Sequence, residues 1–216
     1  KAVLDALIPH IRAGQHVIIS SHASLGAVYL TQALAQRGIQ APITAWGTTV
    51  VTGRRQSATT VQVNTIRSRV DLCTVPESEG SAALALCRNL FGDRFQPRDG
   101  LLAISLSNLN PQNHLGIALG NITRMERGEA WSQGQNVTPK IGRLLEQLDL
   151  ERLAIAKALG LDVKTIFEHF HLSFHVPISS ISEMNQKMHE QGNGGTGPAT
   201  ADSRYVTEDV PYGLQL

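Results

Sequence analysis

The pattern that most constrains the fold is a strand, a turn, a helix and a second strand within the first fifty residues. Residues 16–20 form a short apolar segment with β-branched side chains, and residues 21–26 are a polar turn. Residues 27–37 have helical periodicity and end at Gly38, and residues 39–51 are extended. Two strands joined by a helical crossover run parallel. The sequence therefore predicts a βαβ unit.

The rest of the first half also alternates between strands and helices. Residues 1–13 place apolar side chains on one helical face and end at Gly14. Residues 60–75 alternate apolar and polar side chains with one break, which favours a hairpin or a pair of strands. We expect residues 77–92 to form a helix with an acidic first turn, and the apolar run 101–106 to form another strand. Such alternation is typical of an α/β fold.

The pattern changes near residue 106. Helical periodicity covers residues 113–127, 139–159, 163–174 and 181–191. The longest of these segments has Thr138 at its N-cap, Pro139 in its first turn and Gly160 at its end, as helix boundaries require. We therefore predict an α/β domain over residues 1–106 and an all-helical domain over residues 107–216.

Charge and composition exclude several classes of function. Lys and Arg number 19 against 18 Asp and Glu, so the formal charge of +1 gives no basic field for nucleic acid. The apolar runs are far shorter than the ~20 residues of a membrane span. Cys73 and Cys87 are too few for a disulfide framework in a chain of 216 residues. We therefore expect a cytoplasmic protein with no nucleic-acid or membrane partner.

One polar segment of the second half could move protons. Residues 107–114 (SNLNPQNH) follow the predicted strand at 101–106 and open a helix. Ligands dock at such strand ends, so Asn110 and His114 are candidate site residues. A histidine there can transfer a proton near neutral pH. The alternative is a helix-capping loop with an incidental histidine.

A second polar segment, residues 202–213 (DSRYVTEDVPYG), combines carboxylates with an arginine and two tyrosines. The guanidinium of Arg204 has a fork of donors that fits a substrate carboxylate. An aspartate of this segment could hold a histidine ring in one tautomer and stabilise its protonated form. The alternative is a solvated, charged turn.

Taken together, these motifs resemble a known family. Asn110-Pro-x-x-His114, residues 148–160 (LDLERLAIAKALG) and residues 204–213 (RYVTEDVPYG) are similar to motifs of the opine dehydrogenases. This octopine/nopaline dehydrogenase family includes the bacterial enzymes that make opine metallophores. The resemblance by motif spans about residues 100–216, and the pattern of residues 1–100 is compatible with it.

The resemblance implies an oxidoreductase that uses NADH or NADPH to condense an amino acid with an α-keto acid, giving an opine. By matching positions, His114 and Asp209 would form the catalytic dyad. Arg204 would hold a substrate carboxylate, with Tyr205 also binding substrate. Asn110 would lie beside the nicotinamide or the reacting carbonyl. Such a reaction needs a proton donor near the carbonyl oxygen and the nitrogen, which an imidazole paired with a carboxylate supplies.

The sequence departs from the family in its cofactor motif. The glycine-rich strand–turn–helix that binds a dinucleotide is not found in it, and the glycines of residues 192–197 follow a helix instead of a strand. We therefore interpret residues 1–106 as the second half of a Rossmann-type domain, followed by the helical catalytic domain, with both ends truncated. The strand end at Ser21 and His22 would contribute to the cofactor site together with Asn110.

Other features have plainer interpretations. His171 and His175 share a helical face without an evident third ligand, so we expect structural or surface histidines and no metal site. Trp131 is expected to pack between the domains or to line the pocket for the amino substrate. A possible homodimer would form through the helical half. Two alternative functions are a 2-keto acid reductase of the same architecture and a non-catalytic fragment that binds ligands or dimerises.

Overall fold

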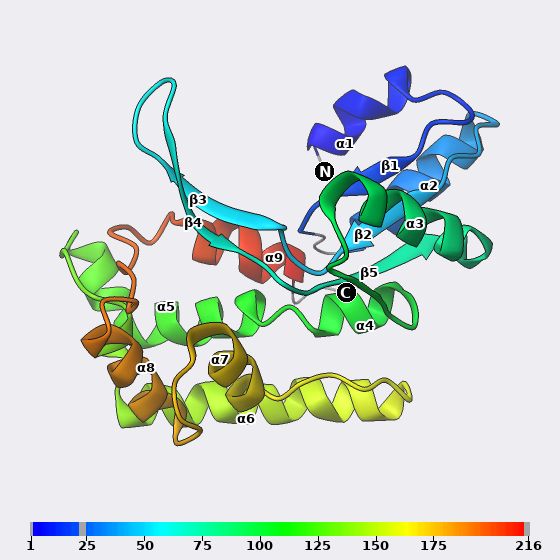
Figure 1. Ribbon diagram of the computed structural model, residues 1–216. Coiled ribbons are helices and arrows are strands. Elements are labelled where there is room, and N and C mark those ends of the chain that lie inside the picture. Colours follow the sequence, from blue (N-terminus) through cyan, green and yellow to red (C-terminus); the bar gives the residue numbers. More distant parts are fainter. Residues whose placement is uncertain (1, 22–24, 214–216) are drawn as a thin grey trace. The chain divides into compact units, whose positions relative to one another are not determined.

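The computed structural model describes residues 2–21 and 25–213. The chain divides into two compact units, Lys1–Ser107 and Asn108–Leu216 (Figure 1). The first unit contains both strands and helices, and the second is built from helices. Among the described residues, no helix combines the length and the apolar character needed to cross a bilayer.

The first unit is built on a mixed four-stranded sheet. Its strands are β1 (Val17–Ile19), β2 (Ile43–Trp46), β5 (Val70–Val75) and β6 (Phe95–Pro97), in the order β1-β2-β5-β6. β1 and β2 run parallel and are joined by α2 (Gly26–Gln36), so the predicted βαβ unit is confirmed. β5 runs antiparallel to β2 and parallel to β6.

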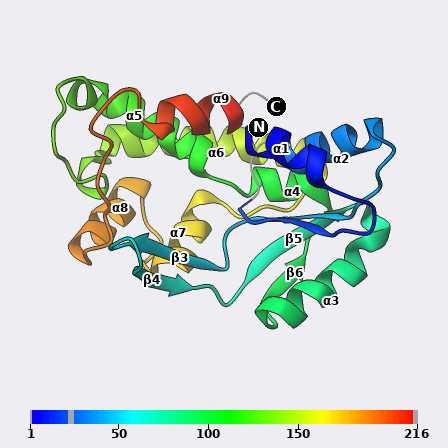
Figure 2. The ribbon, with the colours of Figure 1, turned by 90° about the horizontal axis from the view of Figure 1, so that it is seen from above.

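Helices cover both faces of this sheet. The other helices of the unit are α1 (Ala2–Leu7), α3 (Gly80–Phe91) and α4 (Gly100–Leu106), with short 3-10 turns at Ile8–His10 and Glu77–Glu79. Side chains alternate along the strands, so Ile43 and Ala45 pack with α2 and α4 while Trp46 and Leu72 pack with α3. Figure 2 shows α1, α2 and α4 on one side of the sheet and α3 on the other.

One expectation for this unit needs correction and another is decided between its two alternatives. Residues 101–106 form the helix α4 and not a strand, because Leu101 and Ile104 pack in the core at a spacing of three while Leu102 is 40% exposed. A short apolar run does not by itself distinguish the two structures. For residues 60–75 the alternative of a pair of strands is confirmed, since these strands do not pair with each other as a hairpin would. β4 (Val61–Ile66) pairs with β3 (Val51–Arg55) in a separate ribbon, whereas β5 belongs to the main sheet.

The second unit is a set of helices around one apolar core. Its elements are α5 (Asn110–Glu126), a 3-10 turn at Gly134–Asn136, α6 (Pro139–Ala158), α7 (Ile166–Phe174), α8 (Ile181–Glu190), a π-helix at Tyr205–Asp209 and α9 (Val210–Gly213). Thr165 and Ser180 begin α7 and α8 with complete capping boxes. Thr138 stands at the N-cap of α6 without a side-chain capping bond, and Gly160, with φ +69°, follows its end.

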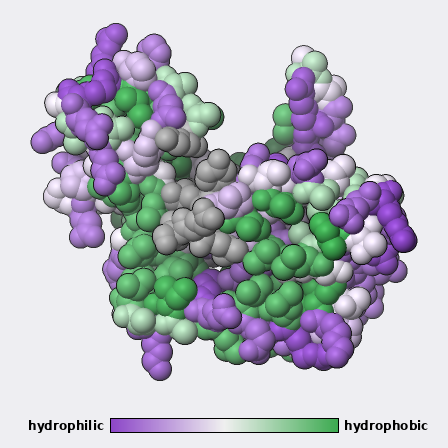
Figure 3. Space-filling model, turned by 180° about the vertical axis from the view of Figure 1, so that it is seen from behind, coloured by the Kyte–Doolittle hydropathy of each residue, from purple (hydrophilic) through white to green (hydrophobic). Residues whose placement is uncertain are grey.

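Apolar side chains fill this core and also reach the surface of the unit. Ile117, Leu145, Ile166 and Met184 are among the buried residues that α5, α6, α7 and α8 contribute to it. Leu119 on α5 and other apolar side chains of α6 remain exposed. Figure 3 shows apolar and hydrophilic groups side by side on the surface.

Candidate active site

One face of α5 carries the polar side chains of the candidate site. Asn110, Asn113, His114 and Ile117 recur at the spacing i, i+3, i+4, i+7, so they lie on the same side of the helix. The helix begins where the sequence dictates, because Pro111 is compatible with a first turn and the Asn108 carboxamide oxygen accepts the Asn110 amide proton at 3.1 Å. This start places His114 in the second turn.

The π-helix at Tyr205–Asp209 brings a carboxylate to this histidine. His114 Nδ1 and Asp209 Oδ2 are 2.8 Å apart, although the two residues are separated by 95 positions. Both side chains are largely buried. An ionised carboxylate only accepts hydrogen bonds, so the neutral imidazole donates from Nδ1 and keeps the lone pair of Nε2. The pair can therefore accept a proton at Nε2 and stabilise the resulting charge.

Tyr205 covers the imidazole ring from one side. The two ring centroids are 3.6 Å apart and the planes differ by 9°, which is a stacked arrangement. The Tyr205 hydroxyl donates to Gln133 Oε1 in the turn before α6. Burial, with the nearby Asp209 carboxylate, raises the pKa of Tyr205. This tyrosine therefore stays neutral and holds the ring of His114 in one plane.

The electrostatics of His114 favour a neutral ring. Burial lowers the pKa of His114 below its ordinary 6.5, because an imidazolium is poorly solvated there. The hydrogen bond and the charge of Asp209 raise this pKa, and the positive charge of Arg204 lowers it further. The net shift is downward. At pH 7 the ring is therefore available as a proton acceptor.

The other predicted site residues lie in different settings. Arg204 is 77% exposed and its Nε donates to Glu208 Oε2 at 2.9 Å, one turn further along the chain. Ser21 belongs to the α/β unit, where it follows β1 in a left-handed conformation with φ 60°. His22 lies outside the described residues. The structure thus brings His114, Asp209 and Tyr205 into contact within the helical unit.

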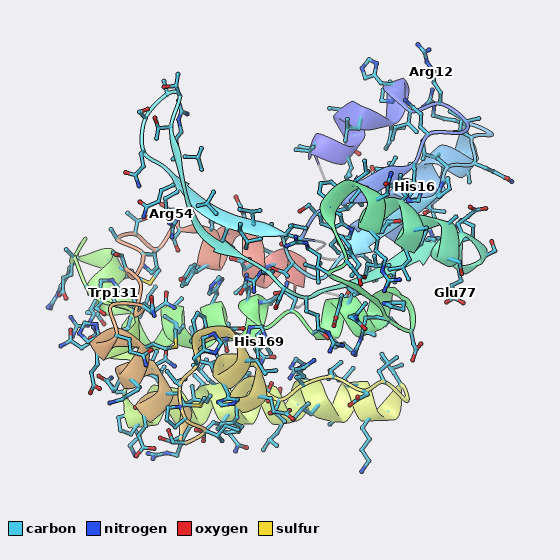
Figure 4. All side chains as sticks on the ribbon, viewed as in Figure 1. Arg12, His16, Arg54, Glu77, Trp131 and His169 are labelled. Carbon is cyan, nitrogen blue, oxygen red and sulfur yellow. The ribbon has the colours of Figure 1, made fainter. Side chains whose placement is uncertain are left out.

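A small cavity adjoins the α5 face. It has a volume of about 120 Å³ and lies among α5, α6, α7 and α8. Its polar walls include Asn110, Asn113 and His114 from α5, Gln133, and His169 on α7. Sequence motifs singled out neither Asn113 nor Gln133 for the site. The helical spacing from Asn110 could have indicated Asn113, whereas Gln133 has no local signal. Figure 4 labels His169 and Trp131 among the side chains of this unit.

The glycine-rich segment after α8 serves packing. A Cβ on Gly197 would lie 2.2 Å from the ring of Trp131, and one on Gly194 would lie 2.8 Å from the backbone of His189. Trp131 is buried in the helical core, and its indole donates to the Pro198 carbonyl at 3.0 Å. These close approaches explain Gly194 and Gly197 without a phosphate group, and the positive φ values of Gly192 and Gly195 explain the other two. Trp131 and the glycine segment also border a second, open hollow of about 540 Å³.

The histidines of α7 have local hydrogen bonds and backbone roles. His171 Nδ1 lies 2.9 Å from the Val176 carbonyl, and His175 ends the helix in a left-handed conformation with φ 55°. In the part of the chain that the structure describes, no group of three or more His, Cys, Asp or Glu side chains is placed to hold a metal ion.

Comparison with known proteins gives one family and one fold. Residues 97–216 match the family described as NAD/NADP octopine/nopaline dehydrogenase, alpha-helical domain. The opine dehydrogenase of Arthrobacter sp. (strain 1C) is 31% identical over 213 residues, which are 95% of this chain and 57% of that protein. The chain therefore spans a little over half the length of this relative.

Solved structures agree in fold at lower identity. An octopine dehydrogenase solved with NADH and L-arginine matches 99% of this chain and 59% of its own, with a TM-score of 0.77 and 17% identity. A yersinopine dehydrogenase with NADP+ matches 98% of this chain and 52% of its own, with a TM-score of 0.60 and 18% identity. The predicted fold class, an α/β unit of Rossmann type followed by a helical unit, is confirmed by these likenesses.

Proposed function

The chain belongs to the NAD/NADP octopine/nopaline dehydrogenase family, as its motifs indicated, and from this premise we propose that the protein is an NAD(P)H-dependent opine dehydrogenase. It would join the amino group of an amino acid, or of a related amine, to the carbonyl carbon of an α-keto acid. Relatives solved with L-arginine, agmatine and pyruvate support these two substrate classes. We further propose that the Lys1–Ser107 unit binds the cofactor and the Asn108–Leu216 unit transfers the proton.

The contact between His114 and Asp209 carries the proposal. Condensation of an amine with a keto acid removes a proton from the ammonium group and delivers protons to the departing carbonyl oxygen. The Nε2 atom of His114 can accept and return such a proton, because its pKa is lowered by burial and its Nδ1 atom is held by Asp209. Asp209 would orient the ring and stabilise the transient imidazolium.

Arg204 and Asn110 would position the substrates around this dyad. Arg204 is exposed, and among the described residues its guanidinium bonds to Glu208 through Nε, which leaves the two terminal nitrogens for a substrate carboxylate. Asn110 lies one helical turn before His114 and borders the same cavity. Tyr205 would act through His114, as a positioning residue that keeps the ring in its plane.

The chemistry of these groups fits a nicotinamide cofactor, since a hydride acceptor needs a proton source beside it. NADH or NADPH, when bound, would supply the hydride that reduces the condensed substrate. The residues that we propose for its site are Ser21, which follows β1, together with His22 and Asn110. The dyad would then deliver the balancing protons at His114 Nε2.

The test is turnover by the protein and its site variants. NADH or NADPH oxidation is followed with pyruvate, 2-oxoglutarate or glyoxylate and a panel of amino acids. We expect His114→Ala and Asp209→Asn each to lower kcat/KM by about 10²–10⁴-fold, as loss of a proton-transfer group does. The exposed His10 provides the matched control, and His10→Gln should leave kcat/KM within twofold of the original. Turnover that is indifferent to His114→Ala would contradict the proposal.

The same assay separates the finer alternatives. Oxidation of NAD(P)H with a keto acid alone would indicate a 2-keto acid reductase, and binding of NADPH without turnover would indicate a non-catalytic binding module. A requirement for an amine that carries metal-binding groups would place the product among the opine metallophores. The cytoplasmic location and the homodimer stay predictions.

A further inference from the structure

Asn113 has an unusual position in the helical unit. Its side chain is on the cavity-lining face of α5, next to His114, and the residue is only 9% exposed. Its Oδ1 atom is buried and has no hydrogen-bond partner among the described residues. A buried polar atom without a partner lowers the stability of the fold, so such atoms are rare without a reason.

Two other buried asparagines of the same unit show what a structural role looks like. Asn121 Nδ2 donates to the Ile117 carbonyl at 3.0 Å, and Asn185 Nδ2 donates to the Ile181 carbonyl at 2.8 Å. In both cases the side-chain amide donates a hydrogen bond to the backbone carbonyl one turn earlier in the helix. Asn113 makes no such bond, although it also lies in a helix. Its amide is therefore left for a group that enters the cavity.

The walls of the cavity that Asn113 borders contain no Asp, Glu, Lys or Arg among the described residues. The described residues that line it provide six apolar side chains, four amides and two imidazoles; the apolar ones are Leu109, Ile117, Leu145, Phe170, Phe174 and Met188. Its volume of about 120 Å³ equals that of about four water molecules at ~30 Å³ each. It can thus hold an amino-acid side chain of four or five non-hydrogen atoms beside the dyad.

We propose that this cavity receives the side chain of the amino substrate, and that Asn113 selects uncharged side chains able to hydrogen-bond to its amide. The inference rests on the proposed function and names the substrate class within it. A carboxylate or an ammonium group would lose its water shell among walls in which no described Asp, Glu, Lys or Arg can pair with it directly. A neutral amide such as that of glutamine would instead satisfy Asn113.

The experiment compares four amino acids of similar length in the intact protein: glutamine, glutamate, methionine and lysine. Turnover is measured with NAD(P)H and pyruvate, and binding is measured separately by isothermal titration calorimetry without the keto acid. For the original protein, we expect kcat/KM for glutamine to exceed that for glutamate and for lysine by about 100-fold or more. Equal use of glutamine, glutamate and lysine would overturn the inference.

Two variants of similar size assign the selectivity to Asn113. Asn113→Leu removes the amide, so glutamine should lose about tenfold or more relative to methionine. Asn113→Asp introduces a carboxylate, so the preference should move from glutamine toward lysine. A glutamine-to-methionine ratio that stays unchanged in a folded Asn113→Leu protein would contradict the role of the amide. If Asn113→Leu does not fold, the inference is tested by the other two results. These are the shift from glutamine toward lysine in Asn113→Asp and the preference of the original protein for glutamine over glutamate and lysine.

The two readouts keep this inference distinct from the proposed function. Turnover without discrimination between glutamine and glutamate would refute the cavity assignment and leave the opine dehydrogenase intact. Calorimetric binding of glutamine, lost in Asn113→Leu, together with no turnover for any pair, would refute the enzyme and support the binding site.

Discussion

The buried ion pair of α6 allows a direct test of how burial sets the strength of a charge pair. Asp149 Oδ1 accepts hydrogen bonds from Arg152 Nε at 2.9 Å and Nη2 at 2.7 Å, and from Gln112 Nε2 at 3.0 Å. Its Oδ2 accepts the backbone proton of Ile166 at 2.9 Å. The carboxylate thereby ties α6 to α5 and to the start of α7. The change is Asp149→Asn, which keeps the size and removes the charge.

The magnitude follows from exposure. The Asp149 and Arg152 side chains are 3% and 6% exposed, so the variant removes the negative charge from a buried ion pair. The side-chain NH₂ of the new asparagine would also point at N–H groups that now donate to the Asp149 carboxylate, and two donors cannot bond to each other. Loss of one partner from a buried pair lowers the free energy of unfolding by about 3–5 kcal/mol. This is a large part of the ~5–15 kcal/mol that stabilises a typical domain.

The chain supplies a matched control. Lys187 and Glu190 form a pair with the same i,i+3 spacing and the same 2.7 Å distance, but their side chains are 56% and 60% exposed. Glu190→Gln should therefore lower the free energy of unfolding by at most about 1 kcal/mol. Urea unfolding of the intact protein, followed by far-UV circular dichroism, measures both variants. If the two changes agree within 1 kcal/mol, burial does not determine the strength of these pairs and the reasoning is wrong.

Two further predictions concern a glycine and the pH dependence of stability. Gly197→Ala would place a Cβ 2.2 Å from the ring of Trp131, so we expect a loss of about 1–3 kcal/mol in urea unfolding. Gly80→Ala, with no atom within 4 Å of the new Cβ, should be neutral or stabilising by up to about 1 kcal/mol; a larger loss for Gly80→Ala than for Gly197→Ala would contradict the packing argument. Burial is the main reason that the pKa values of His114 and His16 lie below 6.5, so the folded protein binds fewer protons than the unfolded one below that pH. The free energy of unfolding should then be highest above pH 6.5 and fall as the pH drops toward the lowered pKa values, by at most about 1.4 kcal/mol per pH unit for each group. His114→Gln should make this slope shallower, and an unchanged slope between pH 6.5 and 5 would show that His114 is not buried in its neutral form.

Local patterns identified most of the elements because each depends on neighbours in sequence. The short apolar, β-branched segment and the helical crossover predicted β1, α2 and β2, and Pro139 with Gly160 bounded α6 to within one or two residues. The same reasoning failed for residues 101–106, where a run of apolar side chains suits a strand and a helix equally. The packing of Leu101 and Ile104 in the core, three residues apart, is what makes residues 101–106 a helix. The strand beside β5 in the sheet is β6 instead.

The candidate site was only partly predictable for a related reason. The motifs singled out His114, Asp209 and Tyr205, but their contact depends on a π-helix that returns the chain to α5 over 95 positions. No local pattern gave the stacking of Tyr205 on the imidazole or the missing partner of Asn113.

The sequence by itself determined the type of most elements, the change from α/β to helical character near residue 106, and the family. The tertiary structure decided which side chains meet, how deeply they are buried and which of them lack a partner. The physical reason is that hydrogen bonds within a helix, caps and turns involve residues a few positions apart. Burial and ring stacking depend on packing between helices and loops that are distant in the chain, and a one-dimensional pattern does not contain those distances.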